Sequence, residues 1–211
     1  MTDAPAKRVG GAARACRADP ELLVSLLAPS ASVGFTAKSQ PTLYWDLSKP
    51  TNRPIEITLT PRGEGGKDIG AAPLLDVIIP KTEAGGVQTL SLAKPPGNQA
   101  PVSLEPGVQY DWVVEVVVHD RSGSDNPTAA TRLQRIKAPG AAIAPQSAAL
   151  EDQYEADRQS GLWYDMLDSL NRMIDQDSEN AGLRQIRQTL LKDQNLLEDK
   201  DGKIKEIPKT Q

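Results

Sequence analysis

The chain has 211 residues, a formal net charge of −4 and a hydrophobic content of 38%. This length allows one core the size of an ordinary domain with a helical addition, but not two large domains. The acidic balance argues against nucleic acid as a partner, because phosphate binding requires clustered lysines and arginines. We also expect no membrane-spanning segment, since no apolar run approaches roughly 18 residues.

Residues 1–20 are rich in alanine and glycine and carry several basic side chains without hydrophobic periodicity. They predict a flexible basic arm. The single cysteine, Cys16, lies in this arm, and no apolar run precedes it as a lipid-attachment site would require. We interpret Cys16 as a free thiol, with an intermolecular disulfide as the alternative. The apolar stretch 22–27 then predicts an edge strand, with a single helical turn as the alternative.

Apolar and polar residues alternate repeatedly between residues 21 and 138. Ile55, Ile57 and Leu59, for example, alternate with polar neighbours, a period of two that buries one face of a strand. Other strands are predicted at 41–47, 74–79, 87–92, 110–119 and 129–136, with proline and glycine turns between them. About six or seven short antiparallel strands are typical of a β-sandwich. We assign this domain to residues 21–138.

A Pro-Gly turn leads into the strand that carries Tyr110 and Trp112 on one face. The pattern Leu104-x-Pro106-Gly107-x-x-Tyr110 resembles the tyrosine corner of fibronectin type III and immunoglobulin-like domains. In that corner the tyrosine hydroxyl bonds to the backbone of the preceding loop. The resemblance implies an immunoglobulin- or fibronectin-like sandwich, and it gives the four residues of this pattern structural roles. We also expect a structural role for Trp112.

The hydrophobic period becomes helical after residues 139–149, which are rich in alanine and proline and predict a linker. Apolar residues recur every three or four positions within 150–196, with a break at 177–182. This indicates a hairpin of about two or three antiparallel helices, followed by a flexible tail at 197–211. The apolar stripes exceed what short helices can bury on each other, so they must contact the sandwich or another chain.

Gly161 precedes the most apolar helix. Together with Trp163, Met166, Leu170 and Ile174 it resembles part of a tetratricopeptide repeat, in which a glycine occupies the tight turn between two helices. A single unit cannot form the groove of a repeat array. We therefore expect Gly161 to take a left-handed conformation after the first helix.

Few residues suit catalysis or metal binding. The single histidine, His119, ends a strand, and no Gly-x-Ser-x-Gly nucleophile elbow occurs, so we predict no catalytic residue. The segment 199–204 resembles the middle of an EF-hand loop but lacks both end ligands, so no metal site is predicted. The acidic loop from Asp120 to Asp125 is a binding candidate without supporting ligand spacing. We expect no cofactor.

Aromatic side chains provide the other binding candidates. Trp163 and Tyr164, with Trp45 and Trp112, could form a platform for carbohydrate if their rings were exposed. We favour core packing, because Trp45 and Trp112 lie on predicted strands and Trp163 lies on an apolar helical stripe.

Further short motifs are Gly10-Gly11 with Cys16 shortly after, Gly34-x-Thr36, Gln40-Pro-Thr-Leu-x-Trp45 and Gly161-Leu-Trp-Tyr-Asp165. With the tyrosine-corner pattern, they make residues 10–196 resemble a bacterial family, the domain of unknown function 928 family. Such proteins typically carry an export signal. The resemblance therefore implies a periplasmic or secreted location if a signal was removed, with a cytoplasmic location as the alternative. It implies no catalytic residue.

The favoured function is a non-catalytic, extracytoplasmic interaction or scaffold protein. We expect a protein partner, which is either an envelope protein or a second copy bound through the helical segment. A sandwich that binds carbohydrate or an envelope polymer is the alternative, and a hydrolase is the least favoured function.

Overall fold

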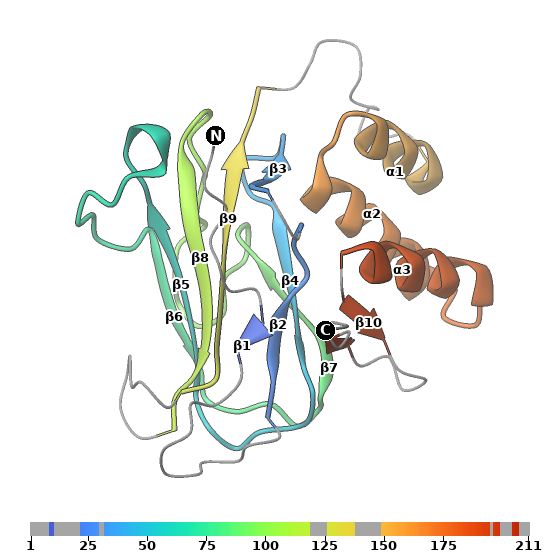
Figure 1. Ribbon diagram of the computed structural model, residues 1–211, viewed down its shortest axis with the longest axis horizontal. Helices are drawn as coiled ribbons and strands as arrows, with labels where there is room; N and C mark the ends of the chain where they lie inside the picture. Colours follow the sequence, from blue (N-terminus) through green and yellow to red (C-terminus); the bar gives the residue numbers. More distant parts are fainter. Residues whose placement is uncertain are drawn as a thin grey trace, which may run out of the picture.

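The computed structural model describes residues 9–10, 22–29, 32–118, 126–137, 149–194, 196–198 and 204–206. Within these ranges the chain is β-rich with three helices near its C-terminal end, which confirms the predicted class (Figure 1). The elements in chain order are β1 (Val9–Gly10), β2 (Val24–Leu26), β3 (Gly34–Thr36), β4 (Thr42–Leu47), β5 (Ile55–Pro61), the 3-10 turn η1 (Glu64–Gly66), β6 (Leu75–Ile79), β7 (Gly86–Ser91), β8 (Gln109–Val116), β9 (Thr128–Arg135), α1 (Leu150–Gln159), α2 (Trp163–Gln176), α3 (Ala181–Asp193), β10 (Leu196–Glu198) and β11 (Ile204–Glu206).

The strands form two larger sheets and a hairpin. The four-stranded sheet has the order β1-β2-β4-β7, the five-stranded sheet has the order β3-β9-β8-β5-β6, and β10 pairs with β11. The prediction of a wholly antiparallel arrangement is wrong at one place, because β3 runs parallel to β9, with Gly34 opposite Leu133. Between β2 and β3 the chain leaves the first sheet for the second, where it lies beside β9.

The inward faces of the two larger sheets form one hydrophobic core. In β8 the burial alternates strictly, with Tyr110, Trp112, Val114 and Val116 buried between more exposed neighbours. The same core cluster includes Trp45 from β4 in the other sheet. The period of two in the sequence thus corresponds to strands with one buried face.

Short β-strands form in two segments that we predicted to be flexible. Val9–Gly10 pairs with β2, so β2 lies inside its sheet and the prediction of an edge strand is wrong. The hairpin β10-β11 lies largely within the predicted tail. Strands of two or three residues are too short to show hydrophobic periodicity. The rest of the basic arm, with Cys16, and most of the predicted linker lie outside the described residues.

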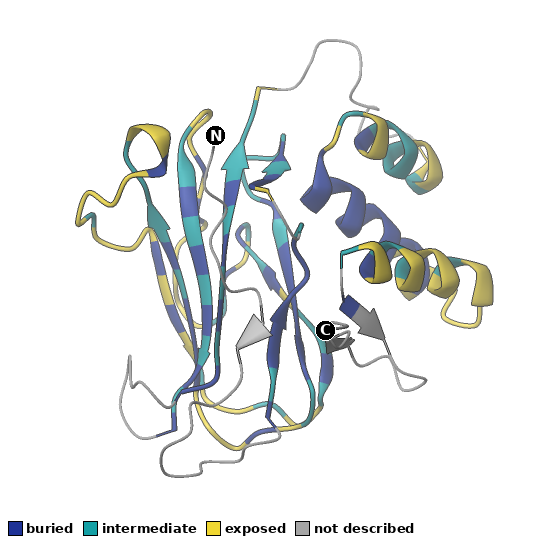
Figure 2. Cartoon of the chain, viewed as in Figure 1, coloured by how far each residue is buried: buried dark blue, intermediate teal, exposed yellow. Residues whose placement is uncertain are grey.

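Helix α2 is buried along most of its length, between the sheets and the other two helices (Figure 2). Its residues Trp163, Tyr164 and Met166 belong to the core cluster that the two sheets form. The indole nitrogen of Trp163 donates a hydrogen bond of 3.0 Å to the Leu27 carbonyl. Gly161 has a φ of 69°, the predicted left-handed conformation. The helical segment therefore docks on the sheets of its own chain.

Candidate functional site

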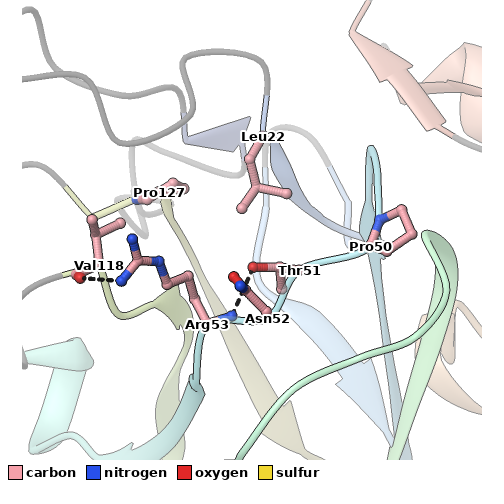
Figure 3. A pocket seen from close by; sticks show the side chains of 7 residues that line it. All are labelled: Leu22, Pro50, Thr51, Asn52, Arg53, Val118 and Pro127. Carbon is pink, nitrogen blue, oxygen red and sulfur yellow. Dashed lines mark hydrogen bonds between the residues drawn. The ribbon is translucent and has the colours of Figure 1, made fainter.

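A pocket of about 320 Å³ lies where the chain passes from β4 to β5 (Figure 3). Its wall combines this connection with the end of β8, the residue before β9 and the segment before β2. The lining residues are Leu22, Pro50, Thr51, Asn52, Arg53, Val118 and Pro127. We refer to it below as the loop pocket.

The connection that lines the loop pocket is held by backbone and side-chain hydrogen bonds. Thr51 and Thr82 exchange two backbone hydrogen bonds of 3.2 and 3.0 Å. The Thr51 hydroxyl accepts a hydrogen bond of 3.1 Å from the backbone N–H of Arg53. The guanidinium of Arg53 donates one of 3.2 Å to the carbonyl of Val118 and thereby joins this connection to β8 (Figure 3).

Arg53 supplies the charge of the loop pocket. The residue is exposed, as is its neighbour Asn52, and it forms no ion pair with any residue in the described part of the chain. A guanidinium carries several N–H donors in a planar fork, so most of those of Arg53 can reach a ligand. The pocket is suited to hydrogen-bonding a carboxylate or a carbonyl oxygen.

The binding candidates Asp120 and Asp125, together with His119, lie outside the described residues. The structure describes the residues on either side of this loop, Val118 and Asn126, and a hydrogen bond connects them. The backbone N–H of Val118 donates a hydrogen bond of 2.9 Å to the side-chain oxygen of Asn126. The loop therefore begins and ends at a fixed base beside the loop pocket.

The tyrosine-corner residues have the geometry that the motif implies. The hydroxyl of Tyr110 accepts a hydrogen bond of 2.9 Å from the backbone N–H of Glu105. Gly107 has a φ of 83°, and Leu104 is buried beneath the turn that contains Pro106. Burial raises the pKa of Tyr110, so its hydroxyl stays protonated. These contacts hold the turn through which the chain enters β8.

The aromatic residues do not form a surface platform. Trp163 and Tyr164 are 9% and 0% exposed, and Trp45 and Trp112 are 1% and 0% exposed. Tyr164 packs edge-on against Trp112, with ring centroids 6.2 Å apart. Trp163 and Tyr164 are therefore wrong as candidates for an exposed carbohydrate site, because both anchor α2 on the sheets.

A pair of carboxylates on α2, neither of which was predicted to be a functional residue, joins the helix to the sheets. Asp165 accepts hydrogen bonds of 2.7 Å from the Thr36 hydroxyl and 2.7 Å from the backbone N–H of Ala37. Asp168 accepts bonds of 2.8 Å from the Lys38 ammonium and 2.9 Å from the Tyr44 hydroxyl. The only local signal is their spacing of three residues, which places both on one side of a helix.

A third carboxylate, Asp157, lies near this pair at the end of α1. It is 7% exposed, and its side chain has no hydrogen bond to any part of the chain that the structure describes. Burial and the neighbouring carboxylates Asp165 and Asp168 raise the pKa of Asp157 to about 6. Burial also raises the pKa of Asp165. Asp157 lines a second pocket, described below as the junction pocket.

Among the residues that the structure describes, no cluster of histidine, cysteine and acidic side chains could hold a metal ion. In the same ranges, no helix is both long and apolar enough to cross a membrane.

The chain was also compared with known proteins. A family model described as Domain of Unknown Function (DUF928) matches residues 9–203. No curated protein and no solved structure matches the chain.

Proposed function

The chain belongs to the Domain of Unknown Function (DUF928) family, and we propose that it is a non-catalytic, extracytoplasmic protein-binding module with an immunoglobulin-like β-sandwich. The proposed location rests on the export signal that is typical of the family. The proposed binding role rests on the loop pocket. The two parts of the proposal are tested separately.

The strand order supports the immunoglobulin-like assignment. With β2 taken as strand A, the sheet β2-β4-β7 has the order A-B-E and the run β9-β8-β5-β6 has the order G-F-C-C′. The tyrosine corner lies between β7 and β8, which are then strands E and F, as in that fold. The connections β4–β5 and β8–β9 are then the B–C and F–G loops.

The observation that carries the binding role is the exposed Arg53 in a pocket between these two loops. In variable-type immunoglobulin domains the same two loops contribute to ligand binding. Arginine is enriched among the residues that contribute most of the binding energy in protein interfaces. Its planar guanidinium can donate two parallel hydrogen bonds to one carboxylate. We therefore propose a partner protein that inserts an acidic side chain or a chain carboxylate beside Arg53.

A carbohydrate-binding role through tryptophan is not proposed, since those rings lie in the core. An acidic envelope polymer would also suit a guanidinium, and the test below separates it from a protein. A hydrolase is not proposed either.

The binding role can be tested by photo-crosslinking in cells of the native host. A photoreactive amino acid replaces the exposed Asn52, and crosslinked proteins are identified by mass spectrometry. In the same background, Arg53→Glu should lower the yield of the same partner about tenfold, because it replaces a charge-assisted hydrogen bond with repulsion. The matched control is Arg172→Glu, which reverses an exposed charge on α2 and should leave the yield unchanged.

An unchanged yield in the Arg53→Glu variant would refute the binding role. Crosslinking to an acidic polymer, without a protein, would favour the alternative. Cell fractionation with periplasmic and cytoplasmic markers tests the location, and recovery with the cytoplasmic marker would refute an extracytoplasmic one.

A further inference from the structure

The junction pocket is an apolar cavity of about 370 Å³ where α1 and α2 meet the segment between β2 and β3. Most of its wall consists of hydrocarbon and aromatic groups. The lining residues are Pro29, Ser32, Val33, Phe35, Asp157, Arg158, Gly161, Leu162, Trp163, Met166 and Leu190. This volume and this lining are typical of small-ligand pockets, in which a few polar groups fix the orientation of an apolar ligand.

Asp157 is the charged residue in this wall whose side chain has no partner among the described residues. Asp157 is 7% exposed, and its side chain bonds to no residue in the described ranges. The other charged lining residue, Arg158, is already held by Glu155 through bonds of 2.7 and 2.9 Å. A largely buried carboxylate without a donor is unfavourable, so a ligand that brings a hydrogen-bond donor to Asp157 would be stabilised.

The charges around Asp157 are also unbalanced. Asp165 and Asp168 on α2 lie close enough to raise its pKa, and Lys38 is the cation that opposes them. The Lys38 ammonium is bonded to Asp168 at 2.8 Å. The Lys38 ammonium is thus already engaged by Asp168, and a further cation beside Asp157 would be favourable.

The aromatic rings in the wall favour the same kind of ligand. Phe35 and Trp163 line the pocket with Met166. The face of an aromatic ring attracts a cation, and aromatic residues recur in sites that bind organic ammonium groups. The remaining aliphatic wall suits a hydrocarbon chain.

We propose that the junction pocket binds an alkylammonium group, a positively charged nitrogen carried on an apolar chain. The nitrogen donates a hydrogen bond to Asp157, and the chain packs on Met166 and Leu190. This site is distinct from the loop pocket, and the inference does not depend on the function proposed there. The group can belong to a free amine or to a lysine side chain of another protein.

Binding should weaken in acid. The cation binds the ionised form of Asp157, whose pKa is about 6 in the free protein because of burial, Asp165 and Asp168, with Lys38 acting in the opposite sense. The affinity is therefore fully present above about pH 6 and declines as the pH falls through that value.

Calorimetric titration of the full chain tests the proposal with three probes of similar length: n-hexylammonium chloride, n-hexanol and sodium hexanoate. We expect hexylammonium to bind, hexanol to bind at least about tenfold more weakly and hexanoate not to bind. A capped tripeptide with a central lysine distinguishes the two sources. If the tripeptide binds as well as hexylammonium, the source is a protein side chain, and if only hexylammonium binds, it is a free amine.

Variants assign the binding to the pocket. Asp157→Asn should lower the affinity for hexylammonium at least about tenfold, whereas Asp152→Asn, an exposed acid on the same helix, should not change it. Phe35→Leu should lower the affinity about threefold without removing a charge. Equal binding of hexylammonium and hexanoate, equal affinity in the Asp157→Asn variant, or no binding of either cationic probe would overturn the proposal.

Discussion

Gly34 lies against the ring of Tyr164 so closely that a Cβ atom on Gly34 would stand 2.6 Å from Cε2 of the ring. Gly34 begins β3, and Tyr164 is a fully buried residue of α2. The contact therefore joins the parallel strand to the central helix. The absence of a side chain at residue 34 allows the helix to approach the sheet.

We expect Gly34→Ala to destabilise the protein by about 1 to 3 kcal/mol, because a buried aromatic ring must move to admit the methyl group. Urea unfolding followed by tryptophan fluorescence measures the change. The control is Gly182→Ala in the first turn of α3, where the nearest atom is a side-chain oxygen at 3.2 Å. Equal midpoints for Gly34→Ala and the parent would contradict the close approach.

Tyr110 and Tyr164 are both buried tyrosines, but their hydroxyls differ. The Tyr110 hydroxyl accepts a bond from Glu105, whereas that of Tyr164 has no partner among the residues that the structure describes. Tyr110→Phe should therefore destabilise the fold by about 1 to 2 kcal/mol, and Tyr164→Phe should be close to neutral. Chemical denaturation of the two variants measures the difference. Similar losses in both would show that the corner hydrogen bond is not the cause.

The raised pKa of Asp157 predicts how this residue affects stability with pH. Its pKa rises from 3.8 to about 6 on folding, so between these values the native state holds a proton that the unfolded chain has released. The carboxylate therefore destabilises the fold fully above about pH 6. This effect declines below pH 6 and is lost as the pH falls through 3.8, the pKa of Asp157 in the unfolded chain.

Asp157→Asn should accordingly raise the free energy of unfolding by on the order of 1 kcal/mol near neutral pH, with the gain vanishing near pH 4. Urea unfolding at several pH values measures it, and Asp152→Asn is the exposed control on the same helix. A gain that is independent of pH would rule out titration of Asp157 as its source.

The C-terminal helices should not fold alone. Leu170 and Trp163 are nearly or fully buried, and Trp163, Asp165 and Asp168 each bond to residues that precede β5. A peptide of residues 146–211 exposes these groups, and short helices are marginal in water without tertiary contacts. Circular dichroism and sedimentation should find it mostly unfolded or self-associated. A monomeric peptide with cooperative unfolding would disprove this dependence on the sheets.

The strands and the tyrosine corner could be predicted because their signals are local. Ile55, Ile57 and Leu59 alternate within a single strand, and Tyr110 bonds to a residue only five positions away. In both cases the residues that determine the structure lie within one short segment of the sequence, where a pattern can reveal them. The turn at Gly161 is local in the same sense, because a left-handed residue after a helix favours glycine.

The carboxylates of α2 could not be predicted in the same way. From the hydrophobic period of the helix, Asp165 and Asp168 are expected to face solvent, because the apolar stripe lies elsewhere on the helix. Their partners Thr36 and Lys38 lie 129 and 130 positions away. Nothing local indicates which distant hydroxyl or ammonium will meet a given aspartate. The loop pocket is likewise built from four separate segments of the chain.

The docking of α2 also constrains the order in which the chain can fold. Trp163 bonds to a carbonyl 136 residues earlier, and the bonds of Asp165 and Asp168 close loops of similar length. During synthesis the segment that contains Gly34, Thr36 and Tyr44 emerges long before the helix that covers it. Contacts with such large sequence separation form slowly, because the loop must close before they stabilise the fold. The nascent sheets therefore expose an uncovered apolar face until the last quarter of the chain has been made.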